Sequence, residues 1–442
     1  MDKDLSVLSD KSLVLVFTYA PAGLGHLRVT DALYHGLPKD TVPILLGSQD
    51  KSISFLHRLT SIHPILRGVM EWTQRGLPED IFTDFYRQYL RHRTRLIYEQ
   101  LVTILDQRID LPKTVLVIST HFGLAHQLAA IKEKIIQDKK IRLILIVVVT
   151  DDSPQHVWYV PGTDLTFVPS YKTKAALLDY GKKKGLEKIQ IEVASYPLSP
   201  HFTQELSKEA LRIRQDQLDA SQKIPIEVSV PISGAAAGTD ILTESVDSLF
   251  QRSTRFLFHM VARSTPYTQA FIRKMTERPY VKLHVSTNDR EVVDGYEDIY
   301  KGNIISLEIT KPSEQAFKAL LSPKQRGGAV LLFTKPVGRL EYDNLEFLRR
   351  HMMIPNADEQ KKLWEAAENN RPFNQIKKSW RGIILPESPK KTADFVWWCL
   401  KERIFSTMTT IFQPKKENNR EDEEINPDGV RMIWEKVGQF IG

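Results

Sequence analysis

Cysteine is almost missing from this chain of 442 residues, since Cys399 is the only one. That excludes an internal disulfide and a cysteine-based metal site, and it suits a reducing compartment. Long apolar runs are missing as well. No stretch of about 18 uncharged apolar residues occurs, and the opening MDKDLSVLSDKS lacks the apolar core of a signal peptide. We therefore expect a cytoplasmic protein without a membrane-spanning helix, and peripheral association with the inner face of the membrane stays open.

What is present fits a globular protein that binds anions. Apolar residues make up 42% of the chain and charged residues 26%, which is ordinary for a soluble protein. The length exceeds one ordinary core, so we expect two domains of about 200 residues each. The net charge of +7 favours anionic partners such as nucleotides and phospholipid surfaces. We expect no nucleic-acid partner, because no known binding module is recognisable.

Apolar runs alternate with helical patterns along the whole chain. The strand candidates are 12–20, 113–120, 141–150, 164–170, 189–197, 224–233, 254–261, 280–287, 303–310, 328–336 and 381–387. This βαβ rhythm predicts the α/β class with two Rossmann-like parallel-sheet domains. Prolines near Ser199 place the boundary there, giving domains over 1–198 and 199–442. An amphipathic last helix over 430–441 should dock on another part of the fold.

Small and polar residues follow the first predicted strand, at the end where open α/β sheets bind ligands. The stretch APAGLGHLRVTDAL places Gly23 and Gly25 in a turn and His26 at the start of a helix. Glycine lets a ligand approach the backbone, and a helix start attracts an anion. A tight turn with a helix-capping histidine explains the same residues about equally well.

Two further strand ends carry candidate groups. Asp151 and Asp152 follow the most apolar run, where carboxylates can serve acid/base chemistry or bind hydroxyls. Capping of a helix or turn is the alternative for both. His121 follows another strand, where capping or packing is as reasonable as ligand contact. His156 and Trp158 lie in the loop before the next strand.

The second half repeats this design. VPISGAAAGTDIL leads from a strand through small residues into a helix. Ser233 and the residues from Gly234 to Gly238 could therefore surround a diphosphate with backbone N–H groups.

A second helix start in this half carries a carboxylate. Glu341 and Asn344 lie three residues apart on one helical face, and a carboxylate there can accept two sugar hydroxyls. The plainer explanation for Glu341 is a favourable charge in a first helical turn, stabilising by under about 1 kcal/mol.

A helical insertion is expected over 51–110. Within it, 84–101 predicts one helix with Arg87, Arg91 and Arg95 on a shared face and Arg93 close by. Such a helix can lie on an anionic membrane surface. A solvated basic face on a helix packed against the sheet is the equal alternative.

Together these motifs resemble the GT-B glycosyltransferases. The resemblance is strongest to the branch with plant monogalactosyldiacylglycerol synthases, bacterial processive diacylglycerol glucosyltransferases and MurG-type enzymes. AGLGHLRVTDAL is similar to the glycine-rich loop and helix of that branch, TSIHPILRGVMEW to its lipid-binding region, and VVTDDSPQHVWYVPGTDLTFVPSYKTKAALLDYG to its TD run. Specific motifs cover 12–205, and the second half matches in layout and at ISGAAAG, KPSE and GRLEYDN.

The resemblance implies two domains facing across a cleft and transfer of a sugar from a nucleotide-sugar, with UDP favoured, to a lipid or other membrane-proximal acceptor. It implies that His26 is the catalytic base or orients the acceptor, and that Asp151 or Asp152 polarises it or holds hydroxyls. The implied acceptor-side residues are Gly23, Gly25, His121, His156 and Trp158. The implied donor-side residues are Ser233, Gly234, Gly238 and Thr239 for the diphosphate, and Glu341 and Asn344 for the ribose or sugar.

Neither a metal nor another cofactor is expected. GT-B enzymes generally need no bound metal, because helix dipoles and backbone N–H groups carry the charge of the leaving diphosphate. No HEXXH or comparable ligand spacing is present in the sequence either.

Two other functions fit the same plan. A sugar-nucleotide epimerase would need additional catalytic carboxylates and no membrane face. A degenerate module that binds a nucleotide-sugar without turnover is suggested by the altered loop SGAAAG.

Overall fold

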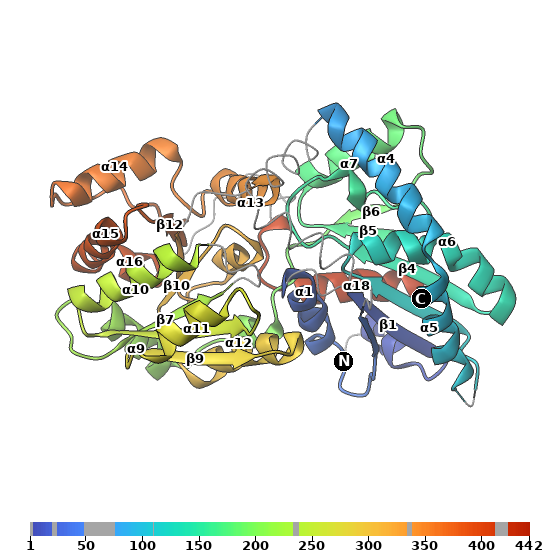
Figure 1. The fold of residues 1–442 in the computed structure, drawn as a ribbon, viewed down its shortest axis with the longest axis horizontal. Coiled ribbons are helices and arrows are strands. Elements are labelled where there is room, and N and C mark those ends of the chain that lie inside the picture. Colours follow the sequence, from blue (N-terminus) through green and yellow to red (C-terminus); the bar gives the residue numbers. More distant parts are fainter. Residues whose placement is uncertain are drawn as a thin grey trace. The chain divides into compact units, whose positions relative to one another are not determined.

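The computed structural model describes residues 3–19, 24–47, 76–108, 110–232, 238–333, 338–411 and 423–442, which belong to two compact units (Figure 1). The first unit contains Met1–Ser199 together with Asp422–Gly442, and the second contains Pro200–Glu421. The chain therefore leaves the first unit after Ser199 and returns to it for its last helix.

The first unit is built on a six-stranded parallel sheet. Its strands in spatial order are β2 (Ile44–Gly47), β1 (Leu13–Tyr19), β3 (Thr114–Ser119), β4 (Arg142–Val148), β5 (Leu165–Val168) and β6 (Ile191–Val193). The apolar residues of the central strands are buried, as they should be when helices cover both faces. The strand order reverses between β1 and β3. In open α/β sheets, the crevice at such a reversal is where ligands bind.

The second unit has a sheet of the same kind. Its strands in spatial order are β12 (Gly382–Ile384), β11 (Ala329–Leu332), β10 (Leu307–Thr310), β7 (Ile226–Pro231), β8 (Phe256–Arg263) and β9 (Val281–Ser286). All pairings in both sheets are parallel. The α/β class and the plan of two parallel-sheet units are thus confirmed. Each predicted strand overlaps an observed one, although β8 runs two residues beyond its predicted end, and β2 was not predicted.

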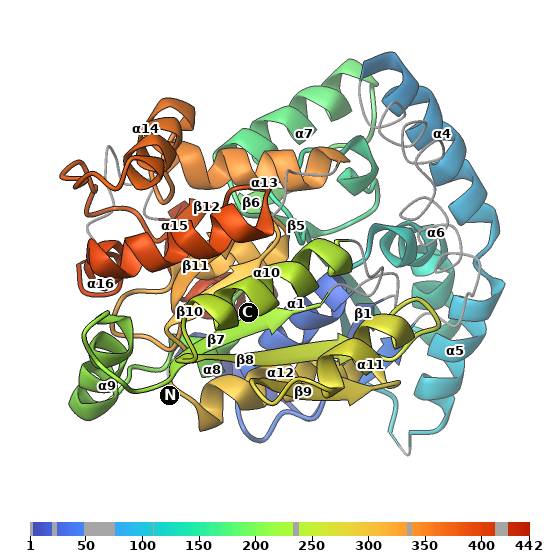
Figure 2. The same cartoon turned by 60° about the vertical axis from the view of Figure 1, so that its left-hand side comes forward.

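Helices surround each sheet. Those of the first unit are η1 (Lys3–Ser9), α1 (Leu24–His35), α4 (Gly76–His92), α5 (Arg95–Asp106), α6 (Phe122–Lys139), η2 (His156–Trp158), α7 (Tyr171–Lys183) and α18 (Gly429–Ile441). Those of the second are α8 (Pro200–Thr203), α9 (Lys208–Leu218), α10 (Thr239–Arg252), α11 (Gln269–Thr276), α12 (Asp289–Gly302), η3 (Glu314–Leu320), α13 (Gly338–Arg350), α14 (Ala357–Glu368), α15 (Pro389–Lys401) and α16 (Ile404–Met408). In the second unit α10 packs beside α15 (Figure 2). Among the described helices, none is long and apolar enough to cross a bilayer.

The single helix expected over 84–101 is wrong. α4 ends at His92 and α5 begins at Arg95, with Thr94 as the N-cap residue. The break changes the direction in which the arginines after position 92 project, so the three-arginine face does not form.

The last helix, α18, completes the first unit. The indole Nε1 of Trp434 donates a hydrogen bond to the carbonyl of Leu33 at 2.9 Å, and its ring meets Phe17 of β1 edge-on. Gly429 lies so close to the chain that a Cβ there would stand 2.2 Å from the carbonyl oxygen of Ser195. Close backbone approach of this kind explains the glycine at the start of the helix.

The core of the second unit contains buried charges. Glu308 of β10 is fully buried and forms an ion pair with Lys318, which also donates a hydrogen bond to the hydroxyl of Tyr300 at 2.8 Å. Burial raises the pKa of Glu308 to about 7 and lowers the pKa of Arg381 to about 9. Both shifts express the free-energy penalty of charge in a core, which the surrounding partners offset.

Candidate functional site

The candidate site lies at the sheet reversal of the first unit. β1 leads into α1 with His26 in its first turn, β3 ends just before Thr120, and β4 ends shortly before Thr150. Since β1, β3 and β4 are neighbours in the sheet, their carboxyl ends bring these three residues together.

His26 is held in a defined orientation. Its Nδ1 lies 2.7 Å from the carbonyl oxygen of Thr120 and 3.2 Å from Oγ1 of Thr150. A carbonyl oxygen only accepts, so Nδ1 carries the hydrogen and Nε2 is the basic nitrogen of the neutral ring. The side chain is only half-buried. The arrangement can therefore present an accepting imidazole nitrogen, as a general base requires.

Two threonine hydroxyls fix the backbone beneath this imidazole. Thr30 and Thr120 both donate to the carbonyl oxygen of His26, at 2.9 and 3.1 Å. Their Oγ1 atoms are also 2.8 Å apart and both residues are buried. The first turn of α1 is thereby tied to the end of β3.

The two adjacent aspartates have different surroundings. Asp151 is half-buried, and its Oδ2 accepts a long hydrogen bond of 3.4 Å from the hydroxyl of Thr150. Asp152 is buried, and its Oδ1 accepts from Ser170 and, at 2.8 Å, from Thr173, both at the start of α7. Asp151 is thus the carboxylate linked to His26 through Thr150, whereas Asp152 binds two hydroxyls at the start of α7, a helix that is capped by Ser170.

Aromatic rings back the imidazole. The His121 ring stands edge-on to His26 with centroids 4.9 Å apart, and the Trp158 centroid is 6.2 Å from that of His26. Phe122 stacks on His121 and meets Trp158 edge-on. His121 is buried and is the N-cap of α6, with its Nδ1 accepting from the backbone N–H of Gly123 at 3.2 Å. Its predicted acceptor role stays a prediction.

A buried histidine of α6 forms a hydrogen bond with the η2 turn, which contains Trp158. The Nε2 of His126 in α6 lies 3.0 Å from the carbonyl oxygen of Val157, so this nitrogen carries the hydrogen. Burial lowers the pKa of His126 to about 3. The ring is therefore neutral at ordinary pH, and it holds the turn by hydrogen bonding alone.

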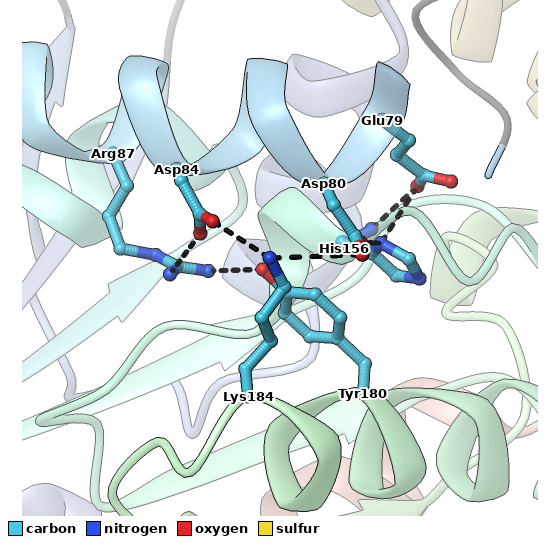
Figure 3. Close-up of polar contacts among 7 residues, drawn as sticks. All are labelled: Glu79, Asp80, Asp84, Arg87, His156, Tyr180 and Lys184. Carbon is cyan, nitrogen blue, oxygen red and sulfur yellow. Dashed lines mark hydrogen bonds and ion pairs between the residues drawn. The ribbon is translucent and has the colours of Figure 1, made fainter. Parts of the chain in front are cut away.

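His156 makes contacts with α4 (Figure 3). Its Nδ1 lies 2.8 Å from Oδ1 of Asp80, and its backbone N–H donates to Oε1 of Glu79 at 2.9 Å. The imidazole stacks on Tyr180 of α7 with centroids 4.0 Å apart. The predicted acceptor residue is thus held from two sides by helices that flank the loop.

The donor-side residues lie in the second unit. Gly238 is the N-cap of α10 with a φ of 81°, a left-handed conformation that favours glycine, and Thr239 begins the helix. Glu341 lies half-buried in the first turn of α13, with Asn344 buried one turn later. β7 and β11 lie on either side of β10, so the starts of α10 and α13 follow strands about 10 Å apart.

The four arginines of the insertion differ in their exposure and in their contacts. Arg87 is buried and donates to the Tyr180 hydroxyl at 3.1 Å, so it cannot reach a membrane. Arg93 lies over the ring of Tyr89, while Arg95 is 91% exposed and paired with Glu99. The exposed arginines of this segment are therefore Arg91, Arg93 and Arg95, not Arg87.

Some predicted residues fall outside the described part of the chain, namely Gly23, Ser233, Gly234 and the stretch TSIHPILRGVMEW. Conversely, sequence reasoning did not select Thr30, Thr120, Glu79 or Asp80. Thr120 follows a predicted strand directly, so the strand-end rule could have found it. No sequence signal joins Glu79 and Asp80 to a histidine more than seventy residues away.

Comparisons with known proteins do not assign the chain to a family. No family model matches it, and no curated protein does. It is similar to S. aureus MnaA with UDP, at 12% identity and a TM-score of 0.46, over 97% of this chain and 96% of that one. It is also similar to UDP-GlcNAc 2-epimerase from Neisseria meningitidis bound to UDP-GlcNAc (10%, 0.44, 97% and 99%) and to Anabaena Alr3699/HepE in complex with UDP and glucose (11%, 0.44, 97% and 98%). Similarities this distant leave the substrate and the reaction open.

Proposed function

We propose that this protein is a glycosyltransferase that moves a sugar from a nucleotide-sugar, with UDP favoured, to a hydroxyl of a lipid or other membrane-proximal acceptor. The observation that carries the proposal is His26, a half-buried imidazole held through Nδ1 at the reversal of the first sheet. The motif resemblance between 12–205 and membrane-lipid glycosyltransferases adds the reaction class.

In this proposal His26 accepts the proton of the acceptor hydroxyl on Nε2. The ring becomes positive as the proton transfers, and the carbonyl of Thr120 stabilises that charge because it accepts from Nδ1. Thr150 accepts from the same nitrogen and donates to Asp151, so the carboxylate supports the charged ring through one hydroxyl. Asp151 therefore acts through Thr150 as a positioning residue.

The donor would bind to the second unit. Backbone N–H groups at the start of α10 suit a diphosphate, and the left-handed Gly238 gives the close approach that phosphate oxygens require. Glu341 in the first turn of α13 would accept hydroxyls of the ribose or the sugar. No metal enters this scheme.

The membrane contact would be made by α4 and the start of α5. Ile81 and Phe85 are 72% and 70% exposed, and Tyr89 continues the same stripe. Arg91, Arg93 and Arg95 follow it and give this surface a positive charge. Exposed apolar side chains beside arginines are typical of surfaces that bind anionic lipid.

The test is a turnover assay with UDP-, GDP- and dTDP-sugars, with and without lipid acceptors, on the full chain and on His26→Ala. We expect transfer with one nucleotide-sugar, and a loss of about 10²-fold or more in His26→Ala with donor binding intact. His92→Ala, an exposed histidine of α4, is the matched control. An isomerised UDP-sugar formed without acceptor would instead favour the epimerase, and near-normal turnover in His26→Ala would refute the mechanism.

A further inference from the structure

The helix α4 exposes large apolar side chains and buries several charged ones. Its outward stripe consists of Ile81, Phe85 and Tyr89 at intervals of four residues, and the first two are mostly exposed. Its inward side contains Glu79, Asp80 and Arg87, each less than one-tenth exposed. Large apolar side chains outside and charges inside both call for a physical reason.

The inward charges form a polar clasp, which we define as Glu79, Asp80, Asp84, Arg87, His156, Tyr180 and Lys184 (Figure 3). Besides the contacts of His156 described above, Lys184 lies 2.8 Å from Oδ2 of Asp84 and 3.7 Å from Oδ2 of Asp80. Arg87 donates to Asp84 at 3.3 Å and to the Tyr180 hydroxyl. The clasp therefore joins α4 to η2 and to the end of α7.

The clasp is connected to the candidate catalytic group through η2. His156 begins η2, and Trp158, which ends it, has its ring 6.2 Å from that of His26. A second, apolar route runs in parallel. Tyr86 of α4 meets Phe122, and Phe122 meets Trp158, with centroids 6.1 and 5.4 Å apart. Both routes begin on α4 and end on the rings that back His26.

We propose that α4 couples surface binding to the candidate site: an anionic lipid surface on its outer stripe holds the helix in place, and the clasp then fixes the η2 turn beside His26. Glu79 and Asp80 are positioning residues in this scheme. The inference rests on the proposed function for its catalytic consequence, but the coupling itself can be measured without turnover.

Charge selects an anionic bilayer as the occupant of the stripe. Arg91 and Arg93 continue beyond it and are exposed, while its acidic neighbours are already paired, Asp84 with Lys184 and Glu99 with Arg95. Anionic lipid therefore meets unneutralised positive charge next to apolar side chains that can enter the headgroup region.

The decisive experiment is hydrogen exchange of the full chain with and without vesicles containing anionic lipid, read in α4 and in η2. In the unmodified protein, vesicles should slow exchange in both segments. The double variant Glu79→Ala/Asp80→Ala should still sediment with the vesicles, and the vesicles should still slow hydrogen exchange in α4. They should no longer slow hydrogen exchange in η2. Asp179→Asn, which removes an exposed carboxylate of α7 next to Tyr180, is the matched control and should behave as the unmodified protein.

A conservative variant separates coupling from loss of structure. Glu79→Gln keeps an oxygen that can accept from the backbone N–H of His156, so it should retain the η2 response, whereas Glu79→Ala should weaken it. If the double variant does not fold, this pair of single variants gives the same comparison. In an active preparation, vesicles should also stimulate turnover in the unmodified protein and in Glu79→Gln but not in the double variant.

Three results would overturn the inference. Vesicles that bind without changing η2 exchange would show that no coupling exists. Equal η2 protection in the double variant would show that the clasp does not carry it. Absence of vesicle binding would show that the outward stripe of α4 does not bind a lipid surface, and a protein partner would then be the alternative. The proposed transferase reaction is judged separately, by the turnover of His26→Ala, and can survive all three.

Discussion

Acid should destabilise the first unit through one buried histidine, and His126→Gln should remove much of that effect. His126 is fully buried in α6, and its folded-state pKa is lowered to about 3, whereas an unfolded histidine titrates near 6.5. Between these values the unfolded chain binds a proton that the folded chain does not. Stability is therefore complete above about pH 6.5 and falls as the pH drops toward 3.

The expected size follows from the same two values. At pH 4.5 the unfolded side chain is charged and the folded one is still neutral, so His126 alone should lower the free energy of unfolding by about 3 kcal/mol relative to pH 8. Glutamine can donate to the carbonyl of Val157 as the imidazole does, but it does not titrate.

Urea unfolding followed by circular dichroism, at pH 8 and pH 4.5, compares the two proteins. The transition of the first unit should lose about 3 kcal/mol more in the unmodified protein than in His126→Gln. His92→Gln is the control, because His92 is exposed and its substitution should leave the pH dependence unchanged. Equal acid losses in the unmodified protein and in His126→Gln would refute the reasoning.

Three further predictions concern other parts of the molecule. Glu308→Gln should destabilise the second unit by about 3 kcal/mol in urea unfolding, because Lys318 is left charged in the core, and the double variant with Lys318→Met should recover most of the loss. Gly429→Ala should destabilise the first unit by about 1–3 kcal/mol and lower its melting temperature, because the added Cβ meets the carbonyl of Ser195. Gly302→Ala, with open space around the added Cβ, should leave the melting temperature unchanged, and equal melting temperatures for the two variants would contradict this account of α18. Glu341→Ala should weaken UDP binding about 10–100-fold by calorimetry, the range expected for losing a hydrogen bond to a charged group, whereas Glu346→Ala on the exposed side of α13 should not; unchanged affinity would remove Glu341 from the donor site.

The strands could be predicted because burial on both faces leaves a mark that needs no tertiary knowledge. The run IRLILIVVVT is apolar without interruption from Leu143 to Val149, and a buried parallel strand is the structure that such a run favours. β2 was missed because only Ile44, Leu45 and Leu46 form its apolar part, which is too short to separate from a loop. The break between α4 and α5 was missed because it falls at Arg93 and Thr94, and neither is a glycine or a proline, the usual signals for a helix end.

The candidate site shows where sequence reasoning ends. His26 and Asp151 were found because both follow strands, and strand ends gather at one edge of a sheet. Asp152 has the same position in the sequence, yet its carboxylate turns to Ser170 and Thr173. The choice between two adjacent carboxylates depends on which way each side chain points. The buried charges of α4 were missed for a related reason, since the period of a helix is visible in the sequence but its inward side is set by partners such as His156 and Tyr180.

The return of the chain to the first unit has a consequence during synthesis. The second unit, Pro200–Glu421, is continuous, whereas the first unit is incomplete until α18, which follows the second unit in the chain, has been synthesised. Until then Phe17 lacks the ring of Trp434, and the carbonyl of Leu33 lacks its donor. The half that contains His26 is thus translated first but completed last, because α18 is synthesised after the whole of the second unit.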